Sequence, residues 1–196
     1  MKRKHSGLEN PPTVQQLKEE LKRVKYRKQY GRILKNTIYT LLVVAAVAIL
    51  IATIWMPALQ IYGASMEPTL EENDIVVSVK TEDFSSGELV CFYIGNKLLV
   101  KRYIAGPGQW VDIDKDGNVY VDGEVLDEPY IKDKAMGEVD VSFPYQIPEN
   151  RIFVLGDHRS TSQDSRNSMV GCISKEQIVG RIIFRVWPLN KIGKVK

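Results

Sequence analysis

The chain has 196 residues, of which 44% are apolar and 26% are charged, and its formal net charge is +3. Its glycine and proline contents exclude a collagen-like, mucin-like or wholly disordered chain, and two cysteines are too few for a disulfide-rich scaffold. This average polarity also argues against a polytopic membrane protein. The charge is unevenly distributed, because residues 1–35 carry a net +8 and residues 36–196 a net −5.

An uncharged interval follows the basic segment. No charged residue occurs between Lys35 and Glu67, and residues 38–56 within this interval are nearly all apolar. As a helix, these 19 residues span about 28 Å, close to the ~30 Å hydrocarbon core of a bilayer. A buried core helix is seldom this long without a charge, and a cleavable signal peptide has a shorter apolar run behind a shorter basic start. We therefore predict an uncleaved transmembrane anchor at residues 36–59.

The charge asymmetry predicts the topology. By the positive-inside rule, residues 1–35 are cytoplasmic and residues 60–196 lie outside, at the cell membrane. The basic segment contains apolar residues spaced as in a short amphipathic helix, namely Val14, Leu17, Leu21 and Val24. Beside a membrane span, this pattern favours orientation and attraction to anionic lipid headgroups over nucleic-acid binding, which we do not expect.

Beyond residue 62, short runs of Val, Ile, Phe and Tyr alternate with turn signals, which is typical of strands. The predicted strands are residues 74–80, 88–94, 97–104, 109–113, 119–121, 151–155 and 180–187. One short stretch, residues 174–178, is a helical candidate. The pattern predicts a mainly β domain of antiparallel sheets or a barrel. Cys91 and Cys172 lie in apolar contexts, which favours buried free thiols over a disulfide, although spacing does not decide this.

Metal sites are not favoured by the sequence. Asp112, Asp114 and Asp116 begin like a calcium-binding loop, but the twelfth position is Gly123, where a bidentate Glu is needed. The same stretch alternates like a β-hairpin. No Cys/His cluster has zinc spacing, since the histidines are His5 and His158. Because His5 precedes the anchor, a serine enzyme outside the membrane must use either His158 or a lysine as its base.

Three segments contain residues suited to such chemistry. In the strand 97–104, Leu99, Lys101 and Tyr103 share one face, and apolar neighbours would lower the pKa of the lysine so that its neutral amine accepts a serine proton. Position alone favours a strand lysine whose amine reaches water. Ser65 is either a turn residue or a nucleophile that needs a base and an oxyanion donor. Residues 156–166, rich in Asp, Ser and Arg, form either a solvated loop or a site that holds the lysine amine.

The three segments together resemble bacterial type I signal peptidases, membrane-anchored serine proteases that remove signal peptides from exported precursors. The similar motifs are S-M-x-P-T at residues 65–69, K-R followed by G-P-G at 101–108, and G-D-x-R-x-x-S-x-D-S-R at 156–166. They occur in the family's order behind one anchor. The resemblance therefore covers nearly the whole chain from the anchor to residue 188.

The resemblance implies a Ser-Lys dyad that cleaves one peptide bond through an acyl-enzyme, without a metal or other cofactor. Ser65 would be the nucleophile and Lys101 the general base. Ser162 would orient the lysine amine, and four residues would shape the site: Asp157, Asp164, Arg166 and Arg102. The pockets would be shallow and select small residues. We suggest their place near Met66 and the strand 74–80.

The sequence departs from the family pattern at four positions. His158 stands where the family commonly has Asn, which leaves a histidine close to the site. Gly63 lacks the hydroxyl that some members use in the oxyanion hole, so backbone N–H groups must carry more of that role. Ala105 and Gln109 are less usual around the G-P-G turn.

Two other functions remain as alternatives. A self-cleaving repressor-type Ser-Lys protease would be cytosolic with a DNA-binding N-terminus, which the 31 uncharged positions before Glu67 disfavour. A single-pass protein whose β domain binds a partner would explain the anchor and the strands, but not three motifs in order. Cleavage of a precursor that carries a signal peptide separates the enzyme from the binder.

The dyad makes a prediction about the base. We expect Ser65→Ala and Lys101→Ala each to abolish cleavage while the protein stays folded and membrane-bound, because nucleophile and base act as a unit. Cleavage of a precursor by purified variants measures this. Activity that survives in Lys101→Ala and disappears in His158→Ala would instead identify a histidine base.

Overall fold

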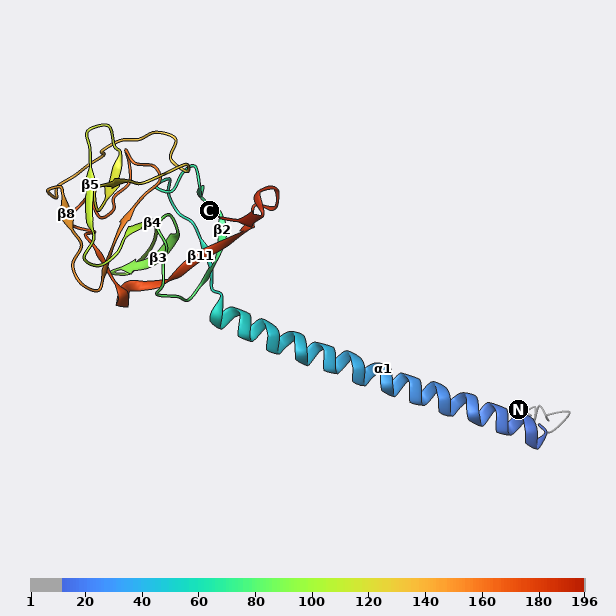
Figure 1. Cartoon of the computed structure of the whole chain (residues 1–196). Helices are drawn as coiled ribbons and strands as arrows, with labels where there is room; N and C mark the ends of the chain where they lie inside the picture. Colours follow the sequence, from blue (N-terminus) through green and yellow to red (C-terminus); the bar gives the residue numbers. More distant parts are fainter. Residues whose placement is uncertain (1–11, 196) are drawn as a thin grey trace, which may run out of the picture. The chain divides into compact units, whose positions relative to one another are not determined.

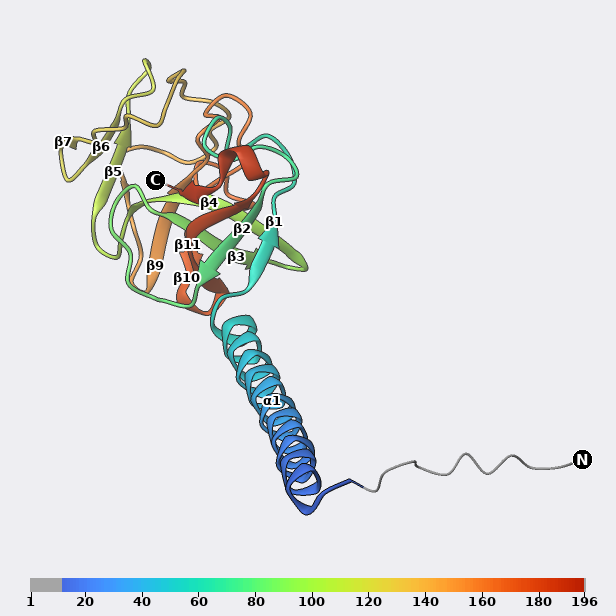
Figure 2. The ribbon, with the colours of Figure 1, turned by 90° about the vertical axis from the view of Figure 1, so that its right-hand side faces the viewer.

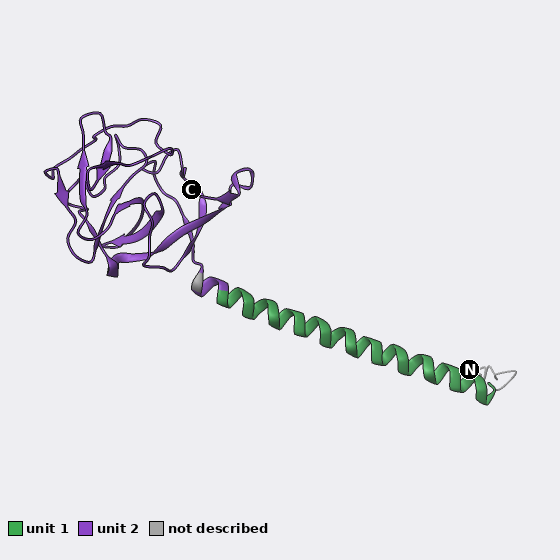
Figure 3. Cartoon of the chain, in the orientation of Figure 1, with its two compact units in different colours: residues 1–51 green, residues 52–196 purple. Residues whose placement is uncertain are grey.

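The structure is a computed structural model that describes residues 12–195, and its element order is shown in Figure 1. The chain divides into two compact units, residues 1–51 and residues 52–196 (Figure 3). Within the described residues, the first unit consists of helix and the second is built almost wholly of strands and turns. The prediction of a mainly antiparallel β domain after one apolar N-terminal helix is therefore confirmed.

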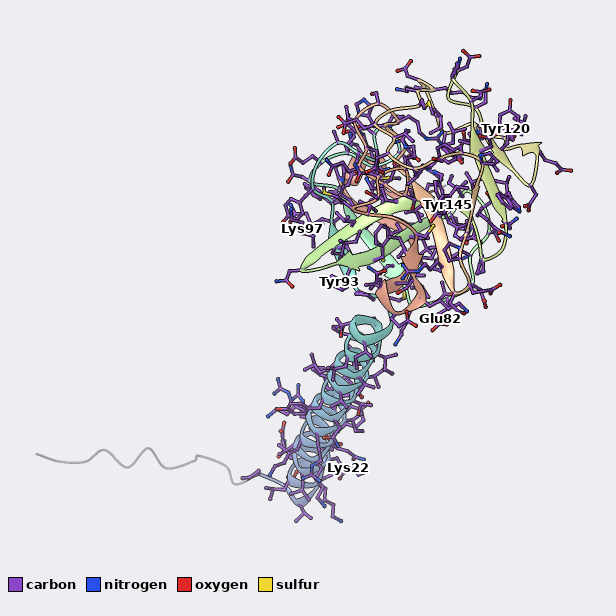
Figure 4. All side chains as sticks on the ribbon, turned by 90° about the vertical axis from the view of Figure 1, so that its left-hand side faces the viewer. Lys22, Glu82, Tyr93, Lys97, Tyr120 and Tyr145 are labelled. Atoms are coloured by element: carbon purple, nitrogen blue, oxygen red, sulfur yellow. The ribbon has the colours of Figure 1, made fainter. Side chains whose placement is uncertain are left out.

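The helix α1 spans Val14–Trp55, a continuous run of 42 residues. The predicted basic amphipathic helix and residues 36–55 of the predicted anchor are thus parts of one helix, about 63 Å long at 1.5 Å per residue. The last two residues of the predicted anchor, Ala58 and Leu59, lie instead in a strand that pairs with the sheet. The side chains of residues 14–54 are exposed and project outward along the helix, as Lys22 does in Figure 4. Among the described residues, α1 is the one helix long and apolar enough to cross a membrane. Pro57, which lacks a backbone N–H, follows the end of the helix.

The β unit contains two antiparallel sheets. The larger has the strand order β1-β2-β11-β3-β4-β9-β10, with β12 paired to β11, and the smaller has the order β7-β6-β5-β8. Figure 2 shows β1, β2, β11 and β3 side by side, with β5, β6 and β7 apart from them. The bounds of the larger sheet are β1 Ala58–Gln60, β2 Ile75–Val79, β3 Leu89–Ile94, β4 Lys97–Ala105, β9 Arg151–Leu155, β10 Ile173–Ser174, β11 Ile178–Trp187 and β12 Gly193–Lys194. Those of the smaller sheet are β5 Trp110–Ile113, β6 Val119–Val121, β7 Glu124–Val125 and β8 Tyr145–Gln146.

All seven predicted strands are present, within two residues at each end. The strands that the sequence analysis missed have two or three residues each: β1, β7, β8, β10 and β12. Such short runs have no measurable alternation, so pairing with a neighbour defines them. The helical candidate 174–178 is a single 3₁₀ turn, η1 Lys175–Gln177, and a second turn, η2 Leu189–Lys191, follows β11. The calcium-like stretch is the β5–β6 hairpin, in which Val111 is opposite Val121.

Three apolar clusters hold the β unit together. One lies where β4 and β9 meet the smaller sheet and includes Ile104, Val111 and Phe153. The other two clusters contain Leu89 and Val90 respectively, neighbours on β3 whose side chains point to opposite faces of the sheet. Strand β9 is buried from Ile152 to Leu155, which explains its unbroken apolar sequence.

The central strands bring two of the three motif segments together. Strand β4 pairs with β9 so that Arg102 is opposite Leu155, the last residue of β9. The turn that begins at Gly156 therefore starts beside Lys101, one residue earlier on β4. Two motifs more than fifty residues apart in the sequence meet because β4 continues beyond the end of its partner.

A close approach between the neighbouring strands β11 and β2 tests this packing. A Cβ added at Gly180 would overlap the carbonyl oxygen of Val79 and lie 2.8 Å from its carbonyl carbon, whereas one added at Gly193 would have no neighbour within 4 Å. We expect Gly180→Ala to lower the free energy of unfolding by about 2 kcal/mol, because backbone cannot move aside at low cost. Gly193→Ala is the matched control. Urea unfolding followed by tryptophan fluorescence measures both, and equal stability of the two variants would contradict this packing.

Candidate active site

Ser65 lies in a turn after β1 that is anchored by buried apolar side chains. The Leu70 N–H donates to the Met66 carbonyl at 2.9 Å, and both side chains pack in the cluster that contains Leu89. Gly63 has a φ of 79°, a conformation that favours glycine. Ser65 itself is half-buried, and no hydrogen bond within residues 12–195 uses its Oγ or its backbone N–H. The hydroxyl and one backbone donor thus remain available at the same residue.

Lys101 lies in the middle of β4 and is only 3% exposed. Its partner on β3 is Val90, and Leu99 and Tyr103 on the same face of β4 pack against the cluster that contains Val90. Lys101 Nζ donates a hydrogen bond to Ser162 Oγ at 2.9 Å. The lysine is therefore a buried amine held by a hydroxyl, and its amine does not reach water.

Burial changes the protonation of this amine. Loss of hydration is the largest cause and lowers the pKa of Lys101 from 10.5 to about 8. The negative charge of Asp164 opposes the shift, Arg166 adds to it, and Asp157 also opposes it. Roughly a tenth of the amine is then neutral at pH 7, against roughly 0.03% for an ordinary lysine. The neutral form, which can accept a proton, is thus populated near neutral pH.

Gly156 connects the serine turn with the lysine. The His158 N–H donates to the Ser65 carbonyl at 3.1 Å. A Cβ added at Gly156 would overlap Ser162 Oγ and lie 2.6 Å from the Ser65 carbonyl oxygen. Ser162 and Ser65 therefore approach the same point from two sides, and only a glycine leaves room there. All three motif segments meet at this turn.

Arg102 and Asp157 form a fully buried ion pair. Arg102 Nε donates to Asp157 Oδ1 at 2.7 Å and Nη2 donates to Oδ2 at 2.5 Å, which is a bidentate arrangement. Thr69 Oγ1 donates to Asp157 Oδ2 and accepts a bond from Arg102 Nη2 at 3.2 Å. Because Thr69 ends the turn that begins at Ser65, this pair ties the serine turn to β4 and to the 156–166 loop.

Asp164 and Arg166 form a second buried pair on the other side of the loop. Arg166 Nε and Nη2 each donate to the Asp164 carboxylate at 2.8 Å. Asp164 Oδ2 also accepts the Gly156 N–H at 2.9 Å, and Arg166 Nη2 donates to the Arg159 carbonyl at 2.9 Å. The pair thus holds the backbone that leads to Ser162 at two points, Gly156 and Arg159.

A third buried pair was not predicted. Arg159 bonds the carboxylate of Glu128 through Nη2 and, at 3.2 Å, through Nη1. The ring of Tyr130 lies 3.6 Å from the Arg102 guanidinium carbon. Arg159 and Thr69 belong to the motifs and offered a sequence signal, whereas Glu128 and Tyr130 lie in an irregular segment that offered none.

A pocket of about 560 Å³ opens beside Ser65. It is lined by Met66, by residues 58–63 including β1, and by residues 97–100 at the start of β4. Figure 4 labels Lys97 and Tyr93 at the tip of the β3–β4 hairpin. Met66 thus borders a pocket as suggested, but the strand 74–80 does not line it, because β1 covers the edge of β2.

His158 contacts the serine turn through its backbone rather than its ring. Its N–H bonds the Ser65 carbonyl, and its ring Nδ1 is buried without a hydrogen-bond partner within the described chain. The group that donates a hydrogen bond to the buried Ser162 hydroxyl is the amine of Lys101 and not the imidazole of His158.

The structure also describes the two cysteines and the candidate metal ligands. Cys91 and Cys172 are buried free thiols, as favoured, and burial raises the pKa of each. Residues 12–195 contain no group of three His, Cys, Asp or Glu side chains arranged to hold a metal ion.

Comparison with known proteins gives a family. The profile described as "Signal peptidase, peptidase S26" matches residues 34–187. Signal peptidase I of Bacillus amyloliquefaciens is 34% identical over 167 residues, which cover 80% of this chain and 89% of that protein. Signal peptidase IB of Staphylococcus aureus (strain COL) is 36% identical over 151 residues, which cover 67% of this chain and 78% of that protein. A solved signal peptidase I from Enterococcus faecalis V583 aligns with a TM-score of 0.42 and 24% identity, covers 50% of this chain and 96% of its own, and carries no part of the assignment.

The buried amine can be titrated directly. We expect Lys101 to titrate near pH 8 because its charged form is desolvated. NMR of the detergent-solubilised protein with ¹³C-labelled lysine measures this, and the signal that disappears in Lys101→Arg is the one to follow. A midpoint at the ordinary value of 10.5 would show that the amine is hydrated.

Proposed function

Since the chain belongs to the bacterial type I signal peptidase family, peptidase S26, and is therefore a serine endopeptidase that removes signal peptides, we propose that Ser65 and Lys101 are its catalytic dyad. One observation carries the proposal. The amine of Lys101 is buried, its pKa is lowered to about 8, and it is held by Ser162 on the turn that also bonds the Ser65 carbonyl.

The reaction proceeds through an acyl-enzyme. Neutral Lys101 accepts the proton of Ser65 Oγ as the oxygen attacks the scissile carbonyl carbon. The resulting oxyanion is stabilised by donors that include the free backbone N–H of Ser65. When the intermediate collapses, the lysine ammonium protonates the departing amine, and Ser65 keeps the acyl group as an ester. Water, deprotonated by the same amine, then releases the signal peptide and regenerates Ser65.

The remaining predicted residues position the dyad. Ser162 orients the amine of Lys101, and the pairs Arg102–Asp157 and Arg166–Asp164 hold the two segments that meet at Gly156. A bidentate buried pair fixes direction as well as distance, so each pair restricts how the 156–166 loop can rotate.

The pocket beside Ser65 receives the residues that precede the cleaved bond. Its walls are β1, an edge strand of the larger sheet, and the start of β4. An extended peptide can pair with a free strand edge while alternate side chains enter the pocket, where Met66 forms part of the wall. A shallow apolar wall admits small side chains and excludes bulky ones sterically.

The membrane anchor holds the enzyme near its substrate. We place the apolar part of α1, residues 36–55, in the bilayer, residues 1–35 in the cytoplasm and residues 60–196 outside, on the apolar helix and the charge asymmetry around it. Nine residues separate the end of α1 from Ser65, so enzyme and membrane-bound precursor share one surface and a high effective concentration.

A cleavage assay tests the dyad. We expect the detergent-solubilised protein to cut a precursor that carries a signal peptide, with kcat/KM falling below about pH 8 as Lys101 becomes protonated. A general base acts in its deprotonated form, so activity rises as the pH increases through the pKa of the base. Ser65→Ala should remove the activity. A rate that stays constant from pH 6 to pH 9 would contradict the lysine base.

A further inference from the structure

The segment between β7 and β8, residues 126–144, contacts all three buried arginines of the site. Tyr130 lies against Arg102, and Glu128 pairs with Arg159. The Met136 carbonyl accepts a bond from Arg166 Nη1 at 2.6 Å. The three arginines come from β4 and from the 156–166 loop, so one irregular segment connects parts of the site that are otherwise far apart in sequence.

Glu128 is the acidic residue of this segment that is inside the protein. It is 6% exposed, and Arg159, its partner, is 1% exposed. Arg159 Nε also donates to the Gly156 carbonyl at 3.1 Å. Gly156 lies between Ser162 and the Ser65 carbonyl, so a displacement of Arg159 is transmitted to both the serine turn and the partner of Lys101.

Tyr130 links this pair to the Arg102–Asp157 pair. Its hydroxyl donates to Glu128 Oε1 at 3.1 Å while its ring lies against the guanidinium of Arg102. Burial and the charge of Glu128 raise the pKa of Tyr130, so the phenol keeps the proton that it donates. One side chain therefore connects an ion pair on each side of the site.

We propose that Glu128 is a positioning residue for peptide cleavage, which acts through Arg159 and Gly156 to hold Ser162 and Ser65 against Lys101. The inference rests on the proposed dyad. A removed carboxylate leaves the Arg159 cation buried without a partner, so the guanidinium turns toward water and releases the Gly156 carbonyl. The turn then loosens, and Ser162 no longer fixes the amine of Lys101. Substrate binding beside β1 is unaffected, because Glu128 does not line that pocket.

Glu128 variants test this role through the split between kcat and KM. We expect Glu128→Ala to lower kcat for precursor cleavage about 100-fold, with KM changed less than about threefold, because misplaced reacting groups cost rate and not binding. Glu128→Gln keeps an oxygen acceptor for Arg159, so its kcat should be about tenfold higher than that of Glu128→Ala. The acid limb of the pH profile should move to higher pH in Glu128→Ala, as water reaches Lys101. Glu138→Ala, an exposed residue of the same segment, is the matched control and should match wild type.

Two further measurements keep the test decisive. Thermal unfolding shows whether Glu128→Ala folds. If it does not, Glu128→Gln and Tyr130→Phe test the positioning role, and we expect each to lower kcat about threefold to tenfold. Wild-type kcat in both of these variants overturns the proposal for Glu128. Cleavage that persists in Ser65→Ala, measured in parallel, refutes the dyad itself and is thereby distinguished from a failure of the positioning role.

Discussion

The proposed active site depends on a lysine that is kept out of water. Lys101 is buried on a central strand and has a hydroxyl, not a carboxylate, as its direct hydrogen-bond partner. A carboxylate in contact would stabilise the ammonium ion and raise the pKa, whereas desolvation with a neutral partner lowers it. The two carboxylates near the amine, Asp157 and Asp164, each bond an arginine within the site and not the lysine itself.

These ion pairs are costly elements that the rest of the domain must support. Removing a charge from water costs roughly several kcal/mol per ion even after the protein relaxes, and only good geometry with further hydrogen bonds offsets it. In this domain, both arginines of the two motif pairs also bond backbone carbonyls, Gly87 for Arg102 and Met136 for Arg166. The pairs therefore contribute little net stability and much directional restraint. They hold the turn at Gly156, where there is no room for a side chain.

The strands and the loops position different residues of the site. The sheet places Lys101 by register, since β4 extends beyond the end of β9. The loops place everything that must approach the amine. Their conformation is set by side-chain contacts with partners up to 116 residues away, as between the Arg185 side chain and the Thr69 carbonyl. The register of a strand is specified by which of its faces is buried, whereas the conformation of such a loop depends on individual buried contacts.

Local patterns were sufficient for part of this description. The uncharged interval, the seven longer strands and the three motifs are visible in the sequence because hydropathy period, turn residues and motif order are local properties. Those patterns did not decide whether Lys101 is buried or reaches water, and they contain no sign of Glu128 or Tyr130. Strands of two or three residues were missed for the same reason, since pairing and not sequence period makes them strands.

By itself, then, the sequence determined the order of helix and β domain, the charge on each side of the apolar segment, and the residues able to carry the chemistry. The tertiary structure alone decided which of these residues meet, how far Lys101 is shielded from solvent, and which unpredicted side chains lie around the turn at Gly156. The physical reason is that a pKa and an ion pair depend on neighbours in space. Those neighbours are brought together by strand register and loop packing across more than a hundred residues of chain.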